Sequence, residues 1–173
     1  MSNKQDPQGP SPAGKVRQAD ASDVPTLVLL NRDVQEHHAG LYPADFKADP
    51  SGDELTTFFL GLIKAEQHSI GIFEGAEGPV AYIWIEEVER SASPFMRPSR
   101  VVHIHHIAVK PEARGQRVGS ALLRWADHQA RQSGISQIAA EHWADNSDAG
   151  RFFSSRGFEQ VRITMRRPVS SSD

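Results

Sequence analysis

Three histidines, His103, His105 and His106, lie within residues 101–125 and are followed by a turn that carries two arginines and two glycines. Histidine titrates near neutral pH, so it is suited to taking a proton from an amine. The turn, residues 114–119, is of the kind that presents backbone N–H groups and the positive end of a helix dipole to an anion. The spacing therefore predicts a phosphorylated ligand at the turn and proton chemistry on the segment before it.

A strand, a turn and a helix must position these groups. The β-branched residues between 101 and 109 predict a strand, which has to end at Lys110-Pro111. From Val118 to Ser133 the apolar residues take helical spacing, and Gly134 is a suitable helix end. The three histidines therefore belong to a strand, and the anion turn opens a helix.

Strand alternation predicts which histidines share a face. Without a bulge, His103, His105, Ile107 and Val109 lie on one face of the sheet, and His106 lies with Ile104 on the other. His105 is then the histidine nearest the turn on its own face. This parity favours His105 and His103 for chemistry and a structural role for His106.

The remaining elements complete an α+β domain. Helices are predicted to begin near Asp20, at Asp53 and at Asn146, and further strands at residues 15–18, 69–73, 80–88, 135–143 and 158–165. The order is β-α-α-β-β-β-α-β-α-β, which predicts a mixed central sheet with helices on both faces. Residues 15–168 are predicted to form this domain, residues 1–14 a disordered N-terminal tail and residues 169–173 a polar C-terminal tail.

Composition narrows the function classes. A net charge of −3 gives no general affinity for nucleic acid, and the absence of cysteine excludes thiolate nucleophiles and cysteine-bound zinc. No apolar run approaches the roughly 20 residues of a membrane span, and the first residues do not form a secretory signal. A cytoplasmic protein with neither nucleic acid nor membrane as partner is the resulting expectation.

Two motifs in this order resemble those of the GCN5-related N-acetyltransferase (GNAT) superfamily. The first is the triplet Ile107-Ala108-Val109 followed by the turn Arg114-Gly115-Gln116-Arg117-Val118-Gly119, which is similar to the family's acetyl-CoA signature. The second runs from Asn146 through Ala149, Phe152 and Phe153 to Gly157-Phe158. The resemblance covers roughly residues 15–167, and it implies an acyltransferase with acetyl-CoA as co-substrate.

The resemblance also implies site residues. His103 and His105 match the two strand histidines of arylalkylamine N-acetyltransferases, which implies catalytic roles for both, and Ile107 would offer its N–H to the thioester carbonyl. The positions implied to bind acetyl-CoA are Ile107, Ala108, Val109, Arg114, Gly115, Gln116, Arg117, Val118, Gly119, Ser120, Asn146 and Phe153. No metal ligand is implied.

Two positions depart from the family pattern. Arg117 stands where the family has the first glycine of its motif, a residue that permits close backbone approach to a pyrophosphate. Phe153 stands where many members have a tyrosine that protonates the departing CoA thiolate. Phenylalanine cannot donate a proton, so the thiolate would take one from water.

Several alternatives remain open at this point. Glu86, Glu87 or Glu141 is an alternative base, acting through a water molecule. His142 and Trp143 are candidates for lining the acceptor pocket, as is the segment Glu36-His37-His38. The acceptor itself is expected to be a small-molecule or peptide amine.

Two different functions compete with acetyl transfer. A module that binds acetyl-CoA without transferring the acetyl group would explain Arg117 and Phe153. A metal site made of His103, His105 and His142 has suitable ligands but leaves the anion turn unexplained. The family resemblance is also compatible with a homodimer.

Overall fold

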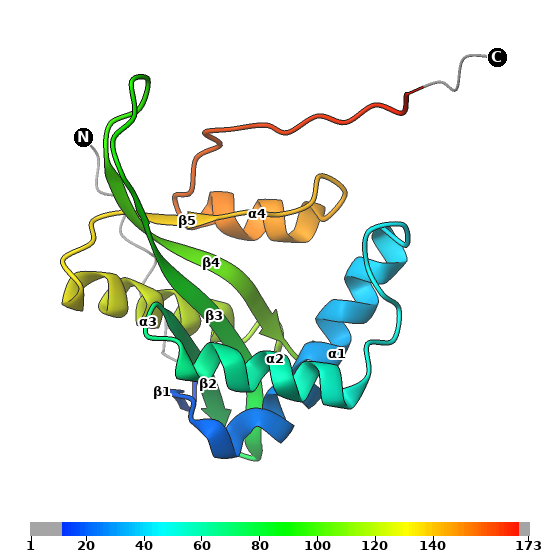
Figure 1. Ribbon diagram of the computed structural model, residues 1–173. Helices are drawn as coiled ribbons and strands as arrows, with labels where there is room; N and C mark the ends of the chain where they lie inside the picture. Colours follow the sequence, from blue (N-terminus) through cyan, green and yellow to red (C-terminus); the bar gives the residue numbers. More distant parts are fainter. Residues whose placement is uncertain (1–11, 170–173) are drawn as a thin grey trace.

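The computed structural model describes residues 12–169. Within this range the chain forms nine main elements, which are labelled in Figure 1. They are β1 (Lys15–Gln18), α1 (Val24–Leu41), α2 (Gly52–Lys64), β2 (His68–Gly75), β3 (Gly78–Arg90), β4 (Ser99–Val109), α3 (Val118–Gln132), β5 (Ile138–Ala140) and α4 (Ser147–Ser155). Most of the predicted N-terminal tail and residues 170–173 of the C-terminal tail lie outside the described residues.

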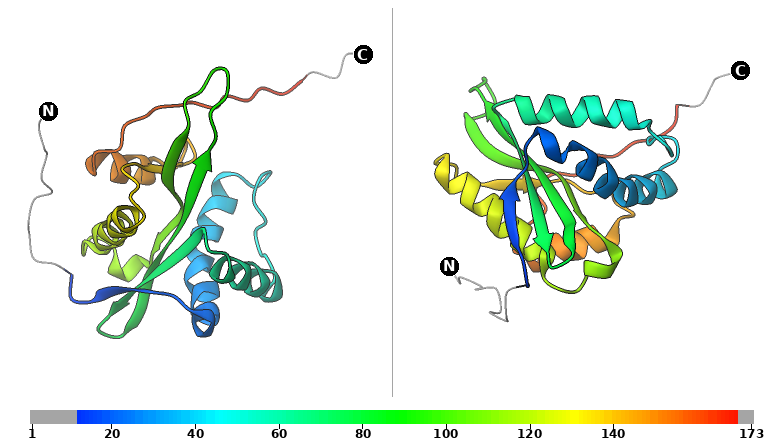
Figure 2. Two further views of the ribbon diagram at one scale, coloured as in Figure 1. Left: turned by 60° about the vertical axis from the view of Figure 1, so that its left-hand side comes forward. Right: turned by 90° about the horizontal axis from the view of Figure 1, so that it is seen from below.

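The sheet has the strand order β1-β2-β3-β4-β5, in which the first four strands are antiparallel and β5 runs parallel to β4. Helices α1 and α2 cover one face, and α3 and α4 lie on the other (Figures 1 and 2). The predicted α+β class, with a mixed sheet between helices, is therefore confirmed. No helix within residues 12–169 combines the length and the apolarity needed to cross a membrane.

Alternation along β3 divides the apolar residues between two cores. Ile83 and Ile85 face α3 and pack with Leu122, whereas Tyr82 and Trp84 face α1 and α2. This is the division that the alternating pattern of residues 80–88 predicts. The large ring side chains of β3, Tyr82 and Trp84, therefore both lie on the face that α1 and α2 cover.

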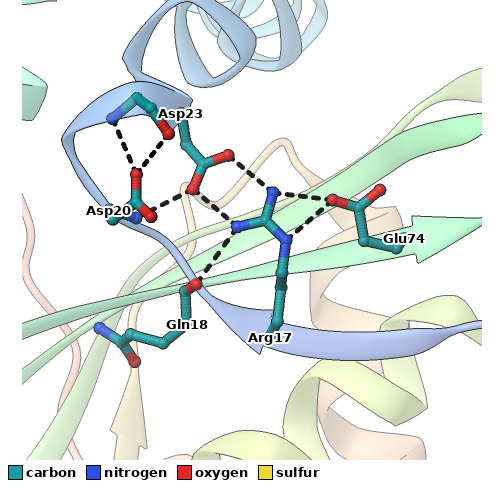
Figure 3. Close-up of polar contacts among 6 residues, drawn as sticks. Arg17, Gln18, Asp20, Asp23 and Glu74 are labelled. Atoms are coloured by element: carbon teal, nitrogen blue, oxygen red, sulfur yellow. Dashed lines mark hydrogen bonds and ion pairs between the residues drawn. The ribbon is translucent and has the colours of Figure 1, made fainter.

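Arg17 on β1 joins the start of α1 to the sheet (Figure 3). Its guanidinium donates two hydrogen bonds to Asp23, at 2.7 and 2.6 Å, and one to Glu74 on β2 at 2.9 Å. The guanidinium keeps the pKa of the Asp23 carboxyl below its usual value. Asp23 is buried and directly precedes α1, so this network fixes the start of α1 relative to β1 and β2.

The predicted final strand, residues 158–165, is wrong. This segment has no regular structure and leaves the sheet (Figure 1), and Val161, Ile163 and Met165 are 95%, 68% and 89% exposed. The preceding strand, predicted over residues 135–143, is only three residues long as β5. A segment becomes a strand only when its backbone N–H and C=O groups can pair with the edge of a neighbouring strand, and β5 is too short to provide such an edge.

Candidate active site

The anion turn lies where the sequence predicts it, between the end of β4 and the start of α3. Gly115 has a φ of +76°, and Arg117, the N-cap of α3, has a φ of +62°. Arg117 is the one non-glycine residue with positive φ within residues 12–169. The turn therefore keeps the left-handed backbone that glycine normally provides, although an arginine occupies the position.

Side chains of the turn fix its shape. The Nε–H of Arg114 donates to the Val109 carbonyl at 3.1 Å, and Gln116 donates from Nε2 to the Glu112 carbonyl at 2.8 Å. The first N–H groups of α3 have no partner within the helix, because no carbonyl lies one turn before them. The turn thus offers N–H donors, a helix dipole and positive side chains to an anion.

The residues of the second motif, 146–158, form the cap of α4 and its packing contacts. Asn146 caps α4 by accepting a hydrogen bond from the Ala149 N–H at 3.1 Å. A Cβ atom added to Gly119 would lie 3.0 Å from the Phe152 ring, so glycine at this position lets α4 approach α3. Phe153 is buried in the core on the α3 side, with its ring centroid 5.1 Å from that of Phe158.

A β-bulge in β4 changes the predicted parity of the histidines. Trp84 on β3 pairs with His106, and the next residue pairs with Ile104, so His105 has no partner of its own. Ile107 and Val109 consequently pack in the same core as Ile104. The predicted parity, which assumed a strand without a bulge, is therefore wrong on two counts, because the extra residue shifts the alternation by one. His106 does not share a face with Ile104, and His105, stacked on Trp84, does not share a face with Ile107 and Val109.

His105 is held between a carboxylate and an indole. Its Nε2 lies 2.7 Å from Glu86 Oε2, and its ring stacks on Trp84 with centroids 4.2 Å apart and planes at 17°. The ring of His103 is 4.6 Å from that of His105, and burial lowers the pKa of His103. The structure therefore brings together both predicted histidines and one of the alternative glutamates.

His68 extends this group on the β2 side. The Trp84 indole N–H donates to Nδ1 of His68 at 3.2 Å, and burial lowers the pKa of His68. An imidazole that accepts at Nδ1 is neutral, which agrees with that shift. The roles of Trp84 and His68 were not predicted. The pairing of β2 with β3 is the signal that could have identified His68, since His68 lies opposite Glu86 in that pairing.

His106 belongs to a second, more deeply buried chain. The Tyr82 hydroxyl donates to Asn31 Oδ1 at 2.8 Å and lies 2.9 Å from His106 Nδ1. Because the hydroxyl has a single proton, His106 must donate its Nδ1–H to the tyrosine oxygen when Asn31 has this orientation. Burial lowers the pKa of His106 to about 4, so it is neutral at pH 7.

The other candidate residues lie around this centre. Glu87 accepts a hydrogen bond from Ser133, which places it on the α3 face and away from the histidines. Glu141 pairs with Arg162 at 3.3 Å. The His142 ring packs over Gly150 on α4, where an added Cβ would approach it to 3.0 Å.

No group of three or more metal-binding side chains suited to hold an ion occurs among residues 12–169. On α1, Glu36 and His37 line an open surface hollow that also includes Arg114 of the anion turn. The residues of the hollow thus connect α1 with the start of the turn.

Comparisons with known proteins agree with this geometry. Residues 31–158 match the model of the acetyltransferase (GNAT) family. An aminoalkylphosphonate N-acetyltransferase of Salmonella typhimurium is 36% identical over 76 residues, which cover 39% of this chain and 49% of that protein. A second curated relative, an N-acetyltransferase of Methanocaldococcus jannaschii, is 26% identical over 111 residues, covering 61% of this chain and 46% of that protein. The chain thus spans about half the length of these curated relatives.

Solved structures share the fold. A tetramutant of a Bacillus halodurans protein superposes with a TM-score of 0.81 at 21% identity, covering 89% of this chain and 99% of that one. A predicted acetyltransferase of Clostridium acetobutylicum, solved with acetyl-CoA, gives a TM-score of 0.67 at 18% identity, covering 90% of this chain and 96% of that one. At these identities the likeness concerns the fold alone.

Proposed function

Because the chain belongs to the acetyltransferase (GNAT) family, we propose that it moves the acetyl group of acetyl-CoA directly to the primary amine of a small molecule or peptide. One observation supports this proposal most directly. The bulge at His105 presents an imidazole, paired with a carboxylate, two residues before Ile107 on the strand that leads to the anion turn.

The turn is suited to hold the phosphates of acetyl-CoA. The left-handed backbone at Gly115 and Arg117 and the free first N–H groups of α3 form a positive concavity. Arg114 adds positive charge beside it. Acetyl-CoA supplies an activated thioester, and the Ile107 N–H is the donor that would stabilise negative charge on its carbonyl oxygen.

His105 is the base in this proposal. Glu86 accepts the Nε2–H of the ring, which leaves Nδ1 free to take a proton from the acceptor ammonium, directly or through a water molecule. The carboxylate then stabilises the imidazolium that forms. His103, with its ring 4.6 Å away, is the second candidate, and Glu86 contributes through His105 rather than as a separate base.

The CoA thiolate leaves without a tyrosine acid. Phe153 occupies that motif position and is buried in the core, and the Tyr82 hydroxyl is engaged with Asn31 and His106. A thiol with a pKa of roughly 8.5 is a tolerable leaving group, so protonation by water suffices.

The test is a panel of primary amines with CoA release as the signal. We expect His105→Ala to lower kcat/KM for the best acceptor by about 100-fold, which is the lower end for loss of a general base. His128→Ala is the matched control, because His128 is an exposed histidine on α3. Full activity of His105→Ala from pH 6 to 9 would show that another group is the base.

A binding module without transferase activity is the second candidate. The buried phenylalanine at position 153 favours it, because a protein that only binds acetyl-CoA needs no acid for the thiolate. This candidate predicts acetyl-CoA binding in calorimetry and no CoA release with any amine of the panel, whereas the enzyme releases CoA with at least one.

A further inference from the structure

An aromatic cluster surrounds Trp143 at the end of the segment that follows β5. The Trp143 ring centroid lies 4.4 Å from that of Tyr42 and 5.2 Å from that of Phe46, and the Phe46 ring is 4.9 Å from that of His38. The Asp145 N–H donates to the Tyr42 hydroxyl at 3.0 Å. The C-terminal end of α1 and the β5–α4 connection are thus joined by ring contacts that are tilted or edge-on.

A guanidinium from the C-terminal segment occupies this cluster. Arg166 donates to both oxygens of Asp45, at 2.7 and 3.1 Å, and its guanidinium carbon lies 5.4 Å from the centre of the Trp143 ring. Residues 159–168 have no regular structure, and their apolar side chains are exposed. Polar contacts therefore hold this segment in place of apolar packing: Arg166 at Asp45 and Trp143, and Arg162 at Glu141.

The chemistry of the site defines its ligand class. Two carboxylate oxygens match the fork of a guanidinium or the N–H groups of an ammonium, and the face of an indole attracts the same charge. A neutral N–H donor would gain only the weaker, uncharged hydrogen bonds, and an anion would be repelled by the carboxylate. The chemistry of Asp45 and Trp143 therefore favours organic cations.

The site adjoins the histidines of β4. His38, which contacts the Phe46 ring, is close enough to His106 to lower the pKa of that residue further. On the other side, Glu141 acts on the pKa of His103 and pairs with Arg162 of the same C-terminal segment. Geometry supports this proximity, because Ala140 pairs with Ile104, next to His103 and His105, and precedes Trp143 by three residues. Three residues of extended chain span at most about 11 Å, so a ligand in the Asp45–Trp143 site lies within reach of the histidines proposed to activate the acceptor.

We propose that the Asp45–Trp143 site binds a second positive group of the acceptor, so that the preferred substrates are diamines or amines with a guanidinium, and that Arg166 occupies it as an internal competitor. The acceptor part of this inference depends on the proposed transferase function. The cation site is independent of that function and can be tested by binding alone.

The binding test uses propylguanidine as the probe and propylurea as its uncharged counterpart, followed by tryptophan fluorescence. Removing the competitor in Arg166→Ala should tighten propylguanidine binding by about five- to tenfold, from the usual strength of exposed ion pairs and cation–π contacts. Arg167→Ala removes the same charge one residue further on and should leave the affinity as in the wild type.

Two further variants make the result decisive. In the Arg166→Ala background, Asp45→Asn should weaken propylguanidine binding at least fivefold, and Trp143→Phe should abolish the fluorescence change. Equal affinity in the wild type and Arg166→Ala, equal tightening in Arg167→Ala, or comparable binding of propylurea would overturn the cation site.

Kinetics then test the acceptor assignment. Arg166→Ala should lower KM for a diamine several-fold relative to Arg167→Ala and leave KM for a monoamine of equal length unchanged. An unchanged diamine KM overturns the acceptor role. Propylguanidine binding as described, with no turnover of any amine, supports the cation site and overturns the proposed function instead.

Discussion

The left-handed backbone at Arg117 provides a direct test of how the anion turn is built. At a φ of +62°, a residue with a Cβ atom costs about 1–2 kcal/mol relative to its preferred conformations. Glycine does not incur this cost, but its unfolded chain gains about 0.5–1 kcal/mol of entropy. Arg117→Gly should therefore be more stable than Arg117→Ala by roughly 0.5–1 kcal/mol, because both variants lose the arginine side chain and only alanine keeps the strain.

The measurement is urea unfolding of the two variants, supported by thermal melting. For a chain of this length, a difference of 0.5–1 kcal/mol corresponds to about 1–4 °C in Tm. Acetyl-CoA affinity is measured on the same samples. If backbone N–H groups hold the phosphates, the two variants should bind equally within about twofold, because the turn is common to both.

The outcomes separate two accounts of the turn. If Arg117→Ala proves as stable as Arg117→Gly, position 117 bears no left-handed strain and our description of the turn is wrong. If both variants lose acetyl-CoA binding by tenfold or more, the guanidinium contacts the phosphates, and the N–H groups alone do not explain the affinity.

Two further predictions concern stability. Arg17→Met should cost about 2 kcal/mol in urea unfolding, less than for a fully buried pair, because the Arg17 side chain is 36% exposed whereas that of Asp23 is only 10% exposed. The lowered pKa of Asp23 means that this contribution is present above about pH 4 and is lost as pH falls through the folded-state pKa, so Arg17→Met should flatten the acid side of the stability profile. Tyr82→Phe should cost about 1–3 kcal/mol, because it leaves the buried Asn31 and the half-buried His106 without their hydrogen bonds to the hydroxyl.

Both predictions have simple controls. Lys15→Met alters an exposed residue on the same strand as Arg17 and should change stability by less than about 0.5 kcal/mol. A similar loss in Lys15→Met would mean that the strand, not the ion pair, is responsible. For Tyr82, a double-mutant cycle with Asn31→Ala should show coupling, and additive losses would argue against a shared hydrogen bond.

Much of the fold could be predicted because its elements have strong local signals. The change from strand to helical spacing at Val118 and the turn glycines position the anion turn correctly. The bulge at His105 could not be predicted, because it depends on how β4 pairs with β3. An argument from alternation assumes an unbroken period of two residues. The contacts of Glu86 and Trp84 with His105 depend on the same strand pairing, so alternation along the sequence does not predict them.

Long-range contacts and missing partners account for the remaining differences. The residues 158–165 have the composition of a strand, but strand propensity reflects packing on a neighbour that is not present here. Trp143 and Tyr42 meet across a long sequence separation, and no local pattern links them. The proposed cation site therefore has no local pattern in the sequence that could predict it.

The extended C-terminal segment has a practical consequence for anyone who handles the protein. Uncovered chain that carries arginines at positions 162, 166 and 167 is a preferred target of trypsin-like proteases. A cut after Arg162 removes Arg166 and leaves helix α4 and the sheet intact. If the proposed cation site exists, a cut and an intact preparation with the same sheet and helices would then differ in their affinity for cations. An intact mass measurement on each batch should precede any ranking of acceptors.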